Sequence, residues 1–365
     1  MATGPNGKIA VWALTSGGLA LARRLAVQWP GAALLGTRRI ADRSEGPPVQ
    51  AFDRLTDAVA EQFHQFGGHL FIMATGIVVR AIAPHLRGKT IDPAVVVVDD
   101  RGRFAVSLVS GHIGGANRLA RQAADLLGAL PVITTATDIH GKPAIDLLAL
   151  ERGLSIENPG GIKGVNMALL ADEPVWVHDP AGWLGTRWAG GAQTFPPQAV
   201  KDPRRLEGHT PAVVWVDDTL RALDPRILVL RPPSLVAGIG CNRGTSLEEI
   251  RGFLDSTFER HALARGSLSA LASIDLKADE AGLCSLAAEM DLPVRFFTRE
   301  ELAQVEDVPT PSAVVSKHIG VPSVCEAAAI LAGRSGPRSS QLIVPKQIAE
   351  NVTVAIVRRV CTSSA

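Results

Sequence analysis

The chain of 365 residues contains no tyrosine, and aromatic residues make up only 4% of it. Proteins that bind single-stranded nucleic acid stack bases on exposed aromatic rings, so this scarcity argues against such a surface. The formal net charge is +1, and no overall basic field attracts nucleic acid or an anionic membrane. Any anionic ligand must therefore be bound by local clusters of basic side chains.

The sequence also lacks closely spaced cysteines and long apolar runs. Its four cysteines are widely spaced without a C-x-x-C pair, which argues against a zinc site or disulfide framework and is typical of a reducing cytoplasm. No apolar run reaches the length of a membrane span. Residues 9–14 resemble the start of a signal peptide, but Thr15-Ser16-Gly17-Gly18 interrupts the run. A first strand, a glycine turn and a helix explain this segment better.

Residues 8–148 alternate between strand-like and helix-like segments, which predicts an α/β layer with a largely parallel sheet. The expected strands are residues 9–14, 69–73, 94–98, 104–108 and 132–134, and the expected helices are residues 19–28, 55–66, 77–83, 117–127 and 145–152. Asp99-Asp100-Arg101-Gly102 lies between two β-rich runs and indicates a hairpin, so one pair of strands should be antiparallel.

A change of amino-acid composition and a pair of prolines divide the rest of the chain. Proline, glycine and tryptophan are frequent between residues 179 and 211, and the proline pair of Arg231-Pro232-Pro233-Ser234 stops both helix and sheet. A second α/β pattern follows, with strands at 235–239 and 271–276 and a β pair at 342–345 and 352–357. We predict an α/β protein in which two α/β sandwich-like units with mostly parallel sheets are joined by a smaller central α+β region. The expected domains are residues 1–148, 149–231 and 232–365.

Three apolar runs between residues 74 and 138 end in small or hydroxyl residues. They end at Ala74-Thr75-Gly76, Ser110-Gly111-His112-Ile113-Gly114-Gly115 and Thr134-Thr135-Ala136-Thr137-Asp138. Glycines at a strand-to-helix turn let the backbone approach a ligand, and the free N–H groups of a helix start favour an anion. With Arg80 and Arg118 nearby in sequence, the segment is predicted to hold a ligand that carries several carboxylates or phosphates.

Ser110 and His112 bring a hydroxyl and an imidazole to the second of these turns. A nucleophilic serine is disfavoured, because Leu108 and Val109 break the G-x-S-x-G pattern of a hydrolase elbow. His112 is a candidate general acid or base, and the alternative is that it caps the helix or packs locally. Asp138 follows a strand end, where ligands of open α/β sheets bind, although it is also a good helix cap.

The C-terminal part offers a second group of candidates. Gly238-Ile239-Gly240-Cys241-Asn242-Arg243-Gly244 resembles a dinucleotide fingerprint, but its third glycine comes one residue late, so a tight turn with an anion-accepting helix start is favoured over an oxidoreductase. Lys277 and Glu280 follow another predicted strand, and a solvated first helical turn is the alternative. Ser246-Leu247-Glu248-Glu249 and Ser323-Val324-Cys325-Glu326 both match a capping box, so a structural role for Glu326 is as plausible as catalysis.

At these residues the sequence resembles the CbiG family, the hydrolases of the oxygen-independent cobalamin pathway. The resemblance covers nearly the whole chain and is weakest over residues 181–211. The segments that carry it are 75–80, 92–99, 107–117, 132–138, 238–241, 272–280, 320–329 and 352–356.

This resemblance implies that the protein opens the δ-lactone of cobalt-precorrin-5A with water and releases acetaldehyde. The cobalt would arrive with the substrate, so we expect no cofactor or metal site in the protein itself. A corrinoid carrier without catalysis is the alternative, since the C-terminal part also resembles a stand-alone protein of the aerobic pathway. We further expect a cytoplasmic protein, transient contact with neighbouring pathway methyltransferases, and self-association.

Position and chemistry, rather than the resemblance, select the candidate residues. The expected catalytic residues are His112, Asp138, Lys277 and Ser110. The expected substrate-binding residues are Thr75, Gly76, Arg80, Gly111, Gly114, Gly115, Asn117, Arg118, Gly240, Arg243, Glu280 and Glu326.

Overall fold

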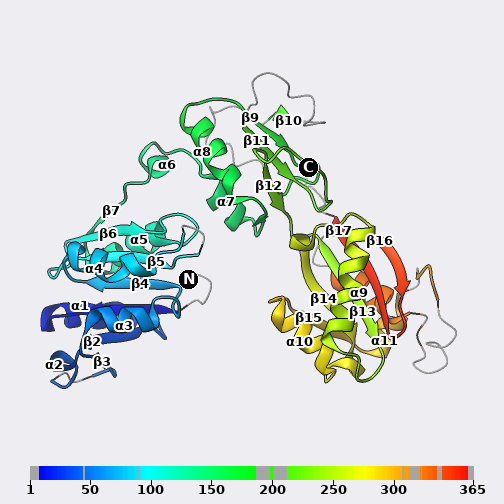
Figure 1. The fold of residues 1–365 in the computed structure, drawn as a ribbon, viewed down its shortest axis with the longest axis horizontal. Coiled ribbons are helices and arrows are strands. Elements are labelled where there is room, and N and C mark those ends of the chain that lie inside the picture. Colours follow the sequence, from blue (N-terminus) through cyan, green and yellow to red (C-terminus); the bar gives the residue numbers. More distant parts are fainter. Residues whose placement is uncertain are drawn as a thin grey trace. The chain divides into compact units, whose positions relative to one another are not determined.

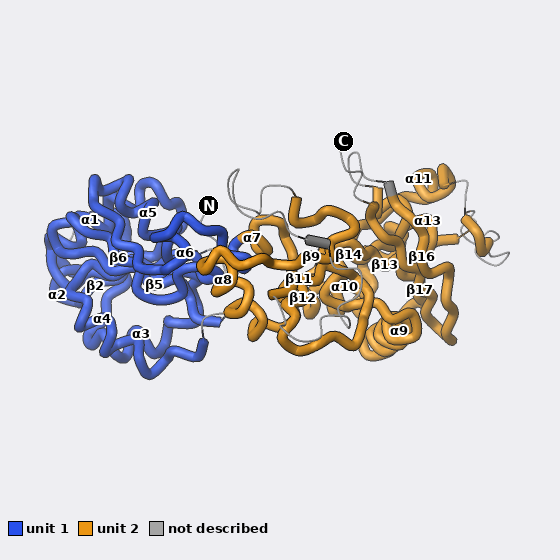
Figure 2. Tube along the Cα trace, turned by 90° about the horizontal axis from the view of Figure 1, so that it is seen from above, with its two compact units in different colours: residues 1–147 blue, residues 148–365 orange. Residues whose placement is uncertain are grey.

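The computed structural model describes residues 8–43, 46–88, 91–185, 198–199, 212–305, 308–311, 321, 323–334 and 339–360. The chain divides into two compact units, residues 1–147 and residues 148–365 (Figure 2). In the described ranges no helix is both long and apolar enough to cross a membrane. Each unit is described by itself below.

The first unit is built on a seven-stranded sheet with the order β3-β2-β1-β4-β5-β6-β7 (Figure 1). Its strands are β1 (Ile9–Ala13), β2 (Ala33–Thr37), β3 (Gln50–Phe52), β4 (Gly68–Ile72), β5 (Ala94–Val98), β6 (Phe104–Val109) and β7 (Leu130–Val132). Strands β1 to β5 are parallel, β6 is antiparallel to β5, and β7 is parallel to β6. The predicted antiparallel pair is confirmed. The carboxyl ends of β6 and β7 therefore lie at the edge of the sheet where β1 to β5 begin.

Helices cover both faces of this sheet. The helices of the unit are α1 (Ser16–Gln28), α2 (Arg38–Ala41), α3 (Leu55–Gln62), α4 (Thr75–Ile82), α5 (Ala116–Leu127), α6 (Ala136–Ile139) and α7 (Ile145–Glu151), the last of which continues past residue 147. Neighbouring residues of β1 point to opposite faces: Val11 packs with apolar residues of α1 and α5, and Trp12 packs with those of α3 and α4. The alternation buries both faces of a largely parallel sheet.

A histidine lies inside the core between the sheet and α3. His69 is fully buried, its Nδ1 accepts a hydrogen bond from Trp12 Nε1 at 3.0 Å, and its Nε2 is 2.9 Å from Phe63 O. These partners require the tautomer with a proton on Nε2 only. Burial lowers the pKa of His69 from 6.5 to about 4, so the folded protein keeps this ring neutral where an unfolded chain would protonate it.

We expect the first unit to lose stability in acid through His69. The full stability is present above about pH 6.5, and lowering the pH toward 4 costs about 3 kcal/mol because the unfolded chain gains a proton that the folded chain does not. Urea denaturation at these two pH values should show a smaller loss for His69→Gln than for the wild type. An equal loss in both proteins would contradict this account of the buried ring.

The second unit holds two five-stranded sheets. The first has the order β10-β9-β11-β12-β8, and its strands and helix are β8 (Ser155–Ile156), α8 (Ile162–Leu170), β9 (Val175–His178), β10 (Gln198–Ala199), β11 (Ala212–Val216) and β12 (Leu228–Arg231). Only β8 runs antiparallel to its neighbour among these pairs. This sheet lies within residues 149–231, the range for which a smaller central region was predicted.

The second sheet of this unit has the order β15-β14-β13-β17-β16. Strands β13, β14 and β15 are parallel to one another, and β17 is antiparallel to both of its neighbours, β13 and β16. Its elements are β13 (Leu235–Cys241), α9 (Leu247–Arg260), β14 (Leu268–Ile274), α10 (Ala281–Glu289), β15 (Val294–Phe297), α11 (Arg299–Ala303), α13 (Val324–Gly333), β16 (Ser339–Ile348) and β17 (Val352–Val360). Helices α9 and α10 pack on one face, and α11 and α13 pack on the other.

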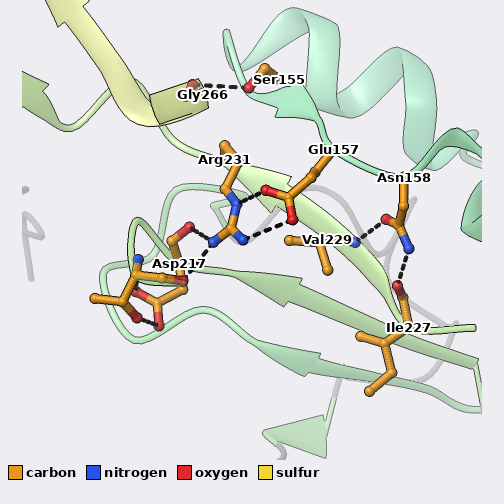
Figure 3. A network of polar contacts seen from close by, with 9 residues as sticks. Ser155, Glu157, Asn158, Asp217, Ile227, Val229, Arg231 and Gly266 are labelled. Carbon is orange, nitrogen blue, oxygen red and sulfur yellow. Dashed lines mark hydrogen bonds and ion pairs between the residues drawn. The ribbon is translucent and has the colours of Figure 1, made fainter. Parts of the chain in front are cut away.

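Polar contacts of Arg231 connect segments of the central sheet to one another (Figure 3). The Arg231 guanidinium is 2% exposed, donates to both oxygens of Glu157, and reaches the carbonyl oxygens of Asp217 and Thr219. Farther along the chain, Asp218 accepts two hydrogen bonds from Arg358 of β17, at 2.6 and 2.8 Å. These bonds satisfy charges that would otherwise be costly to bury.

The α/β fold class is confirmed, and several details differ from expectation. Strands β2, β3, β8, β10, β12 and β15 were not predicted. The segment Ala33–Thr37 of β2 contains alanine, leucine and glycine but no β-branched residue until its last position, so its strand propensity is weak. Strand β7 begins at Leu130, two residues before the predicted start, and its Pro131 concealed it because proline normally interrupts a strand.

Candidate active site

The turn between β6 and α5, residues 110–115, folds back to cap the helix that follows it. Ser110 O accepts the N–H of Ala116, and Gly111 O accepts that of Asn117, both at 3.0 Å. Ser110 and Gly115 have φ values of 59° and 87°, so the backbone is in the left-handed conformation at both ends of the turn. Within the described part of the chain, the N–H groups of residues 111–114 donate to no acceptor. They remain free to bind an anion.

Asn117 ties this turn to the segment after β7. Its side chain is buried, its Oδ1 accepts from Ser107 Oγ at 2.7 Å, and its Nδ2 donates to Thr135 Oγ1 at 2.9 Å and Asp138 Oδ2 at 2.8 Å. A Cβ on Gly111 would lie 2.8 Å from Asn117 Oδ1. Glycine is therefore needed for the turn to approach the amide this closely.

Asp138 is an ionised carboxylate with most of its hydrogen-bonding capacity used. Its Oδ2 also accepts from Thr135 Oγ1 at 2.7 Å, and its Oδ1 accepts from Arg121 Nη2 at 2.6 Å. Burial acts to raise the pKa of Asp138, but the hydrogen bonds from Thr135 and Arg121 outweigh it and hold the pKa below the ordinary 3.8. The carboxylate is thus stable as an anion but is a weak base.

His112 lies between two carboxylates. Its Nε2 is 3.0 Å from Thr137 Oγ1 and 3.3 Å from Asp138 Oδ2, and its Nδ1 is 3.3 Å from Asp146 Oδ2. The hydrogen bond to Asp146 raises the pKa of His112 above 6.5, although burial acts in the opposite direction. The sequence argument missed Asp146, because an acidic residue in the first turn of a helix ordinarily complements the helix dipole.

Ser110 forms no pair with His112 in this structure. Its Oγ is a buried atom without a hydrogen-bond partner among the described residues. The backbone also passes very close to it, since a Cβ on Gly114 would lie 2.3 Å from Ser110 Cβ. A nucleophilic serine needs a base within hydrogen-bond reach, and the described residues provide none at this atom.

The remaining candidates of the first unit lie apart from the His112 cluster, which we define as His112, Asn117, Arg121, Thr135, Thr137, Asp138 and Asp146. Thr75 and Gly76 begin α4 after the carboxyl end of β4, and Arg80 Nη1 folds back onto Gly76 O at 3.0 Å. Because β6 is antiparallel to β5, this end of the sheet is opposite the turn of residues 110–115. Arg118 is exposed on α5, and a Cβ on Gly115 would lie 3.4 Å from its Nη2, so it lies beside the turn of residues 110–115.

In the second unit, the carboxyl ends of the parallel strands β13 and β14 bring another set of candidates together. Glu280 is 4% exposed, and its two oxygens accept from Lys277 Nζ at 3.0 Å and Gly244 N at 2.8 Å. The Lys277 hydrogen bond lowers the pKa of Glu280. Arg243 is exposed and binds Asp279 at 2.6 Å. Gly240 lies at the same strand end, where a Cβ would meet Thr353 Oγ1 at 2.6 Å.

The environment of Glu326 indicates a structural role. It is fully buried, and it accepts hydrogen bonds from Thr310 N, Thr310 Oγ1 and Lys346 N at 3.2, 2.6 and 2.9 Å. The predicted capping box is wrong here, because Ser323 makes no side-chain cap bond and Glu326 is used to hold two other segments. At the other predicted box, Ser246 accepts from Glu249 N at 3.2 Å, while Glu249 binds Asn351.

Metal-ligating side chains do not gather in the described ranges: no group of three or more histidine, cysteine, aspartate or glutamate residues could hold an ion. Burial raises the pKa of the Cys241 thiol beside Lys277. That thiol is accordingly neutral at the strand end where Lys277 and Arg243 carry the positive charge.

Comparison with known proteins places most of the chain in one group. Family models described as Cobalamin synthesis G N-terminal, Cobalamin biosynthesis central region and Cobalamin synthesis G C-terminus match residues 57–138, 143–232 and 235–357. The "Cobalt-precorrin-5A hydrolase" of Salmonella typhimurium is 37% identical over 329 residues, which are 88% of this chain and 91% of the relative. That of Priestia megaterium is 34% identical over 80% of this chain and 79% of the relative.

Among solved structures, a cobalamin biosynthesis protein G homolog from Sulfolobus solfataricus is 24% identical, covers 97% of both chains and has a TM-score of 0.37. The sequence matches, which extend across all three sheets, are the stronger finding. By its three consecutive family matches and its full-length similarity to the two hydrolases, the chain belongs to the cobalamin synthesis G (CbiG) family.

Proposed function

We propose that this protein is a hydrolase of anaerobic cobalamin biosynthesis that converts cobalt-precorrin-5A to cobalt-precorrin-5B and acetaldehyde. The observation that carries this function is the 37% identity to a cobalt-precorrin-5A hydrolase over 91% of that enzyme's length. The cobalt belongs to the substrate, and the proposal needs no cofactor of the protein's own.

The chemistry consumes one water and requires no oxidant. The water oxygen bonds to the lactone carbonyl carbon, and the lactone C–O bond breaks to leave a carboxylate and a hydroxyl group on the two-carbon bridge. Loss of that hydroxyl proton forms the aldehyde carbonyl while the bond from the bridge to the macrocycle breaks. The electron pair of this bond stays with the macrocycle, and acetaldehyde leaves.

The turn of residues 110–115 supports the hydrolytic step. The free N–H groups of residues 111–114 are suited to stabilise the oxyanion that forms at the lactone carbonyl. His112 lies in this turn, Asp138 on α6 faces its Nε2 at 3.3 Å, and both are proposed proton-transfer residues. Lys277, in the second unit, is proposed separately as a further proton-transfer residue. Ser110 is the first residue of this turn, and because its Oγ is buried without a base beside it, the proposal assigns it no attack on the substrate.

Several basic side chains are proposed to receive the acetate and propionate groups of the macrocycle. Charge-assisted hydrogen bonds from guanidinium groups to carboxylates are the strongest of this kind. The proposed contact residues are those predicted from the sequence with the exception of Glu326, and they form three separate groups. Gly111, Gly114, Gly115, Asn117 and Arg118 lie in or directly after the turn of residues 110–115, Thr75, Gly76 and Arg80 lie at the opposite end of the same sheet, and Gly240, Arg243 and Glu280 lie in the second unit.

Replacing Arg243 with glutamine should weaken substrate binding and leave the chemical step nearly unchanged. KM should rise by several-fold and at most about tenfold, because an exposed ion pair is screened by water. Arg226→Gln is the matched control, since Arg226 is also exposed and paired with an aspartate, at 2.7 Å. Steady-state kinetics on both variants would contradict the binding role of Arg243 if kcat fell and KM stayed constant.

The function is tested by incubating the purified protein with cobalt-precorrin-5A without oxygen, trapping volatile aldehyde and following the corrinoid by mass spectrometry. Acetaldehyde in proportion to converted substrate is the expected result. A carrier would bind the macrocycle and release no aldehyde. Delivery of the unstable product to a neighbouring methyltransferase, self-association and a cytoplasmic location complete the proposal, the last in keeping with the wide spacing of the four cysteines in the sequence.

A further inference from the structure

Asp146 is a buried carboxylate that the proposed chemistry has not yet used. It lies in the first turn of α7, is 5% exposed, and faces His112 Nδ1. On the other side of the ring, Nε2 faces the carboxylate of Asp138 and the hydroxyl of Thr137. A neutral imidazole has one donor and one acceptor nitrogen. Only the doubly protonated ring can donate to both carboxylates.

The charges around the ring lead to the same protonation state. The charged groups facing it are Asp138 on α6 and Asp146 on α7, and Arg121 on α5 reaches it through Asp138. A protonated His112 places a positive charge between two carboxylates, whereas a neutral ring removes that positive partner from each negative charge in this largely buried cluster. Such a charge is costly away from water. The raised pKa of His112 has this cause, with Asp146 its largest source.

We propose that Asp146 is a positioning residue that holds His112 as an imidazolium, so that His112 serves the lactone hydrolysis as proton donor and not as the base that activates water. The inference rests on the proposed function. As the lactone C–O bond breaks, the departing oxygen keeps the electron pair and takes a proton from His112. The attacking water gives its oxygen to the acyl carbon and releases its proton to solvent, and solvent reprotonates the ring after the lactone has opened.

The protonation state can be measured in the free protein, without substrate. NMR titration of the His112 ring should give a pKa above the ordinary value in the wild type and a lower pKa in Asp146→Asn. Asp125→Asn is the matched control, because Asp125 is an exposed residue of α5 that loses the same charge; its His112 pKa should equal that of the wild type. A wild-type His112 pKa at or below the ordinary value overturns the proposal, even if Asp146→Asn does not fold.

The direction of the pH dependence separates an acid from a base. Turnover by an acid falls as the pH rises through the pKa of His112, and Asp146→Asn should move this fall to lower pH. Turnover that rises with pH through that pKa would overturn the donor role. If the titration behaves as expected but the wild type releases no acetaldehyde, the proposed function fails and the donor role with it. If acetaldehyde forms while Asp146→Asn leaves the titration unchanged, only the role of Asp146 fails.

Discussion

Replacing Gly238 with alanine should prevent the C-terminal α/β layer from packing as it does now. A Cβ at Gly238, in the middle of β13, would lie 1.9 Å from the backbone oxygen of Cys325 and 2.9 Å from Ala329 Cβ. Both contacts belong to α13, whose residues from Val324 to Gly333 are nearly all buried against the sheet. The helix cannot move away without opening this core, so we expect a loss of about 4 kcal/mol or more.

A second glycine in the same sheet-and-helix layer provides the control. Gly252 lies inside α9, and a Cβ there would meet nothing within 4 Å. Gly252→Ala should therefore keep or raise the free energy of unfolding, by up to about 1 kcal/mol. Thermal denaturation of both variants decides the matter, and Gly238→Ala with the melting temperature of the wild type would show that β13 and α13 are not packed this closely.

Replacing His112 with glutamine should slow acetaldehyde release by roughly 100-fold or more, since a positioned general acid or base contributes on the order of 10²–10⁴. Glutamine keeps a polar side chain at the turn but cannot transfer a proton near neutral pH. The substrate should still bind, because the N–H groups of residues 111–114 and the basic side chains are unchanged.

Single-turnover kinetics with bound substrate separates this loss from a loss of binding. His140→Gln is the matched control, because His140 is exposed and lies two residues after Asp138 at the end of α6. That control should turn over like the wild type. His112→Gln with a rate within about threefold of the wild type would remove His112 from proton transfer.

Periodicity and turn chemistry predicted the elements with strong local signals. Residues 94–98 are four valines after an alanine and form β5 with the predicted bounds. Helix α5 extends from Ala116 to Leu127, one residue beyond the prediction, and ends at Gly128 in the left-handed conformation, the usual helix stop. Strand β2 was missed because a short run of alanine and leucine fits either a helix or a strand.

The candidate site was only partly predictable, because contacts between distant parts of the chain leave no local signal in the sequence. Because β6 and β7 are parallel neighbours, His112 of the turn of residues 110–115 and Asp138 lie close together, with His112 Nε2 3.3 Å from Asp138 Oδ2. The reversal at residues 99–102 was also predicted, yet its consequence was not: it places Thr75 and Gly76 at the other end of the strands. Asp146 was hidden because its partner His112 is 34 residues away in sequence and no local pattern links them.

Turnover of cobalt-precorrin-5A in water enriched in oxygen-18 tests most directly the claim that water opens the lactone. The corrinoid product and the trapped acetaldehyde are analysed separately by mass spectrometry. Attack of water on the lactone carbonyl predicts one heavy oxygen in a new carboxylate of the corrinoid, together with one acetaldehyde for each substrate consumed. A corrinoid that remains bound but unchanged, or one that loses the two-carbon bridge without gaining the label, would contradict hydrolysis at this site.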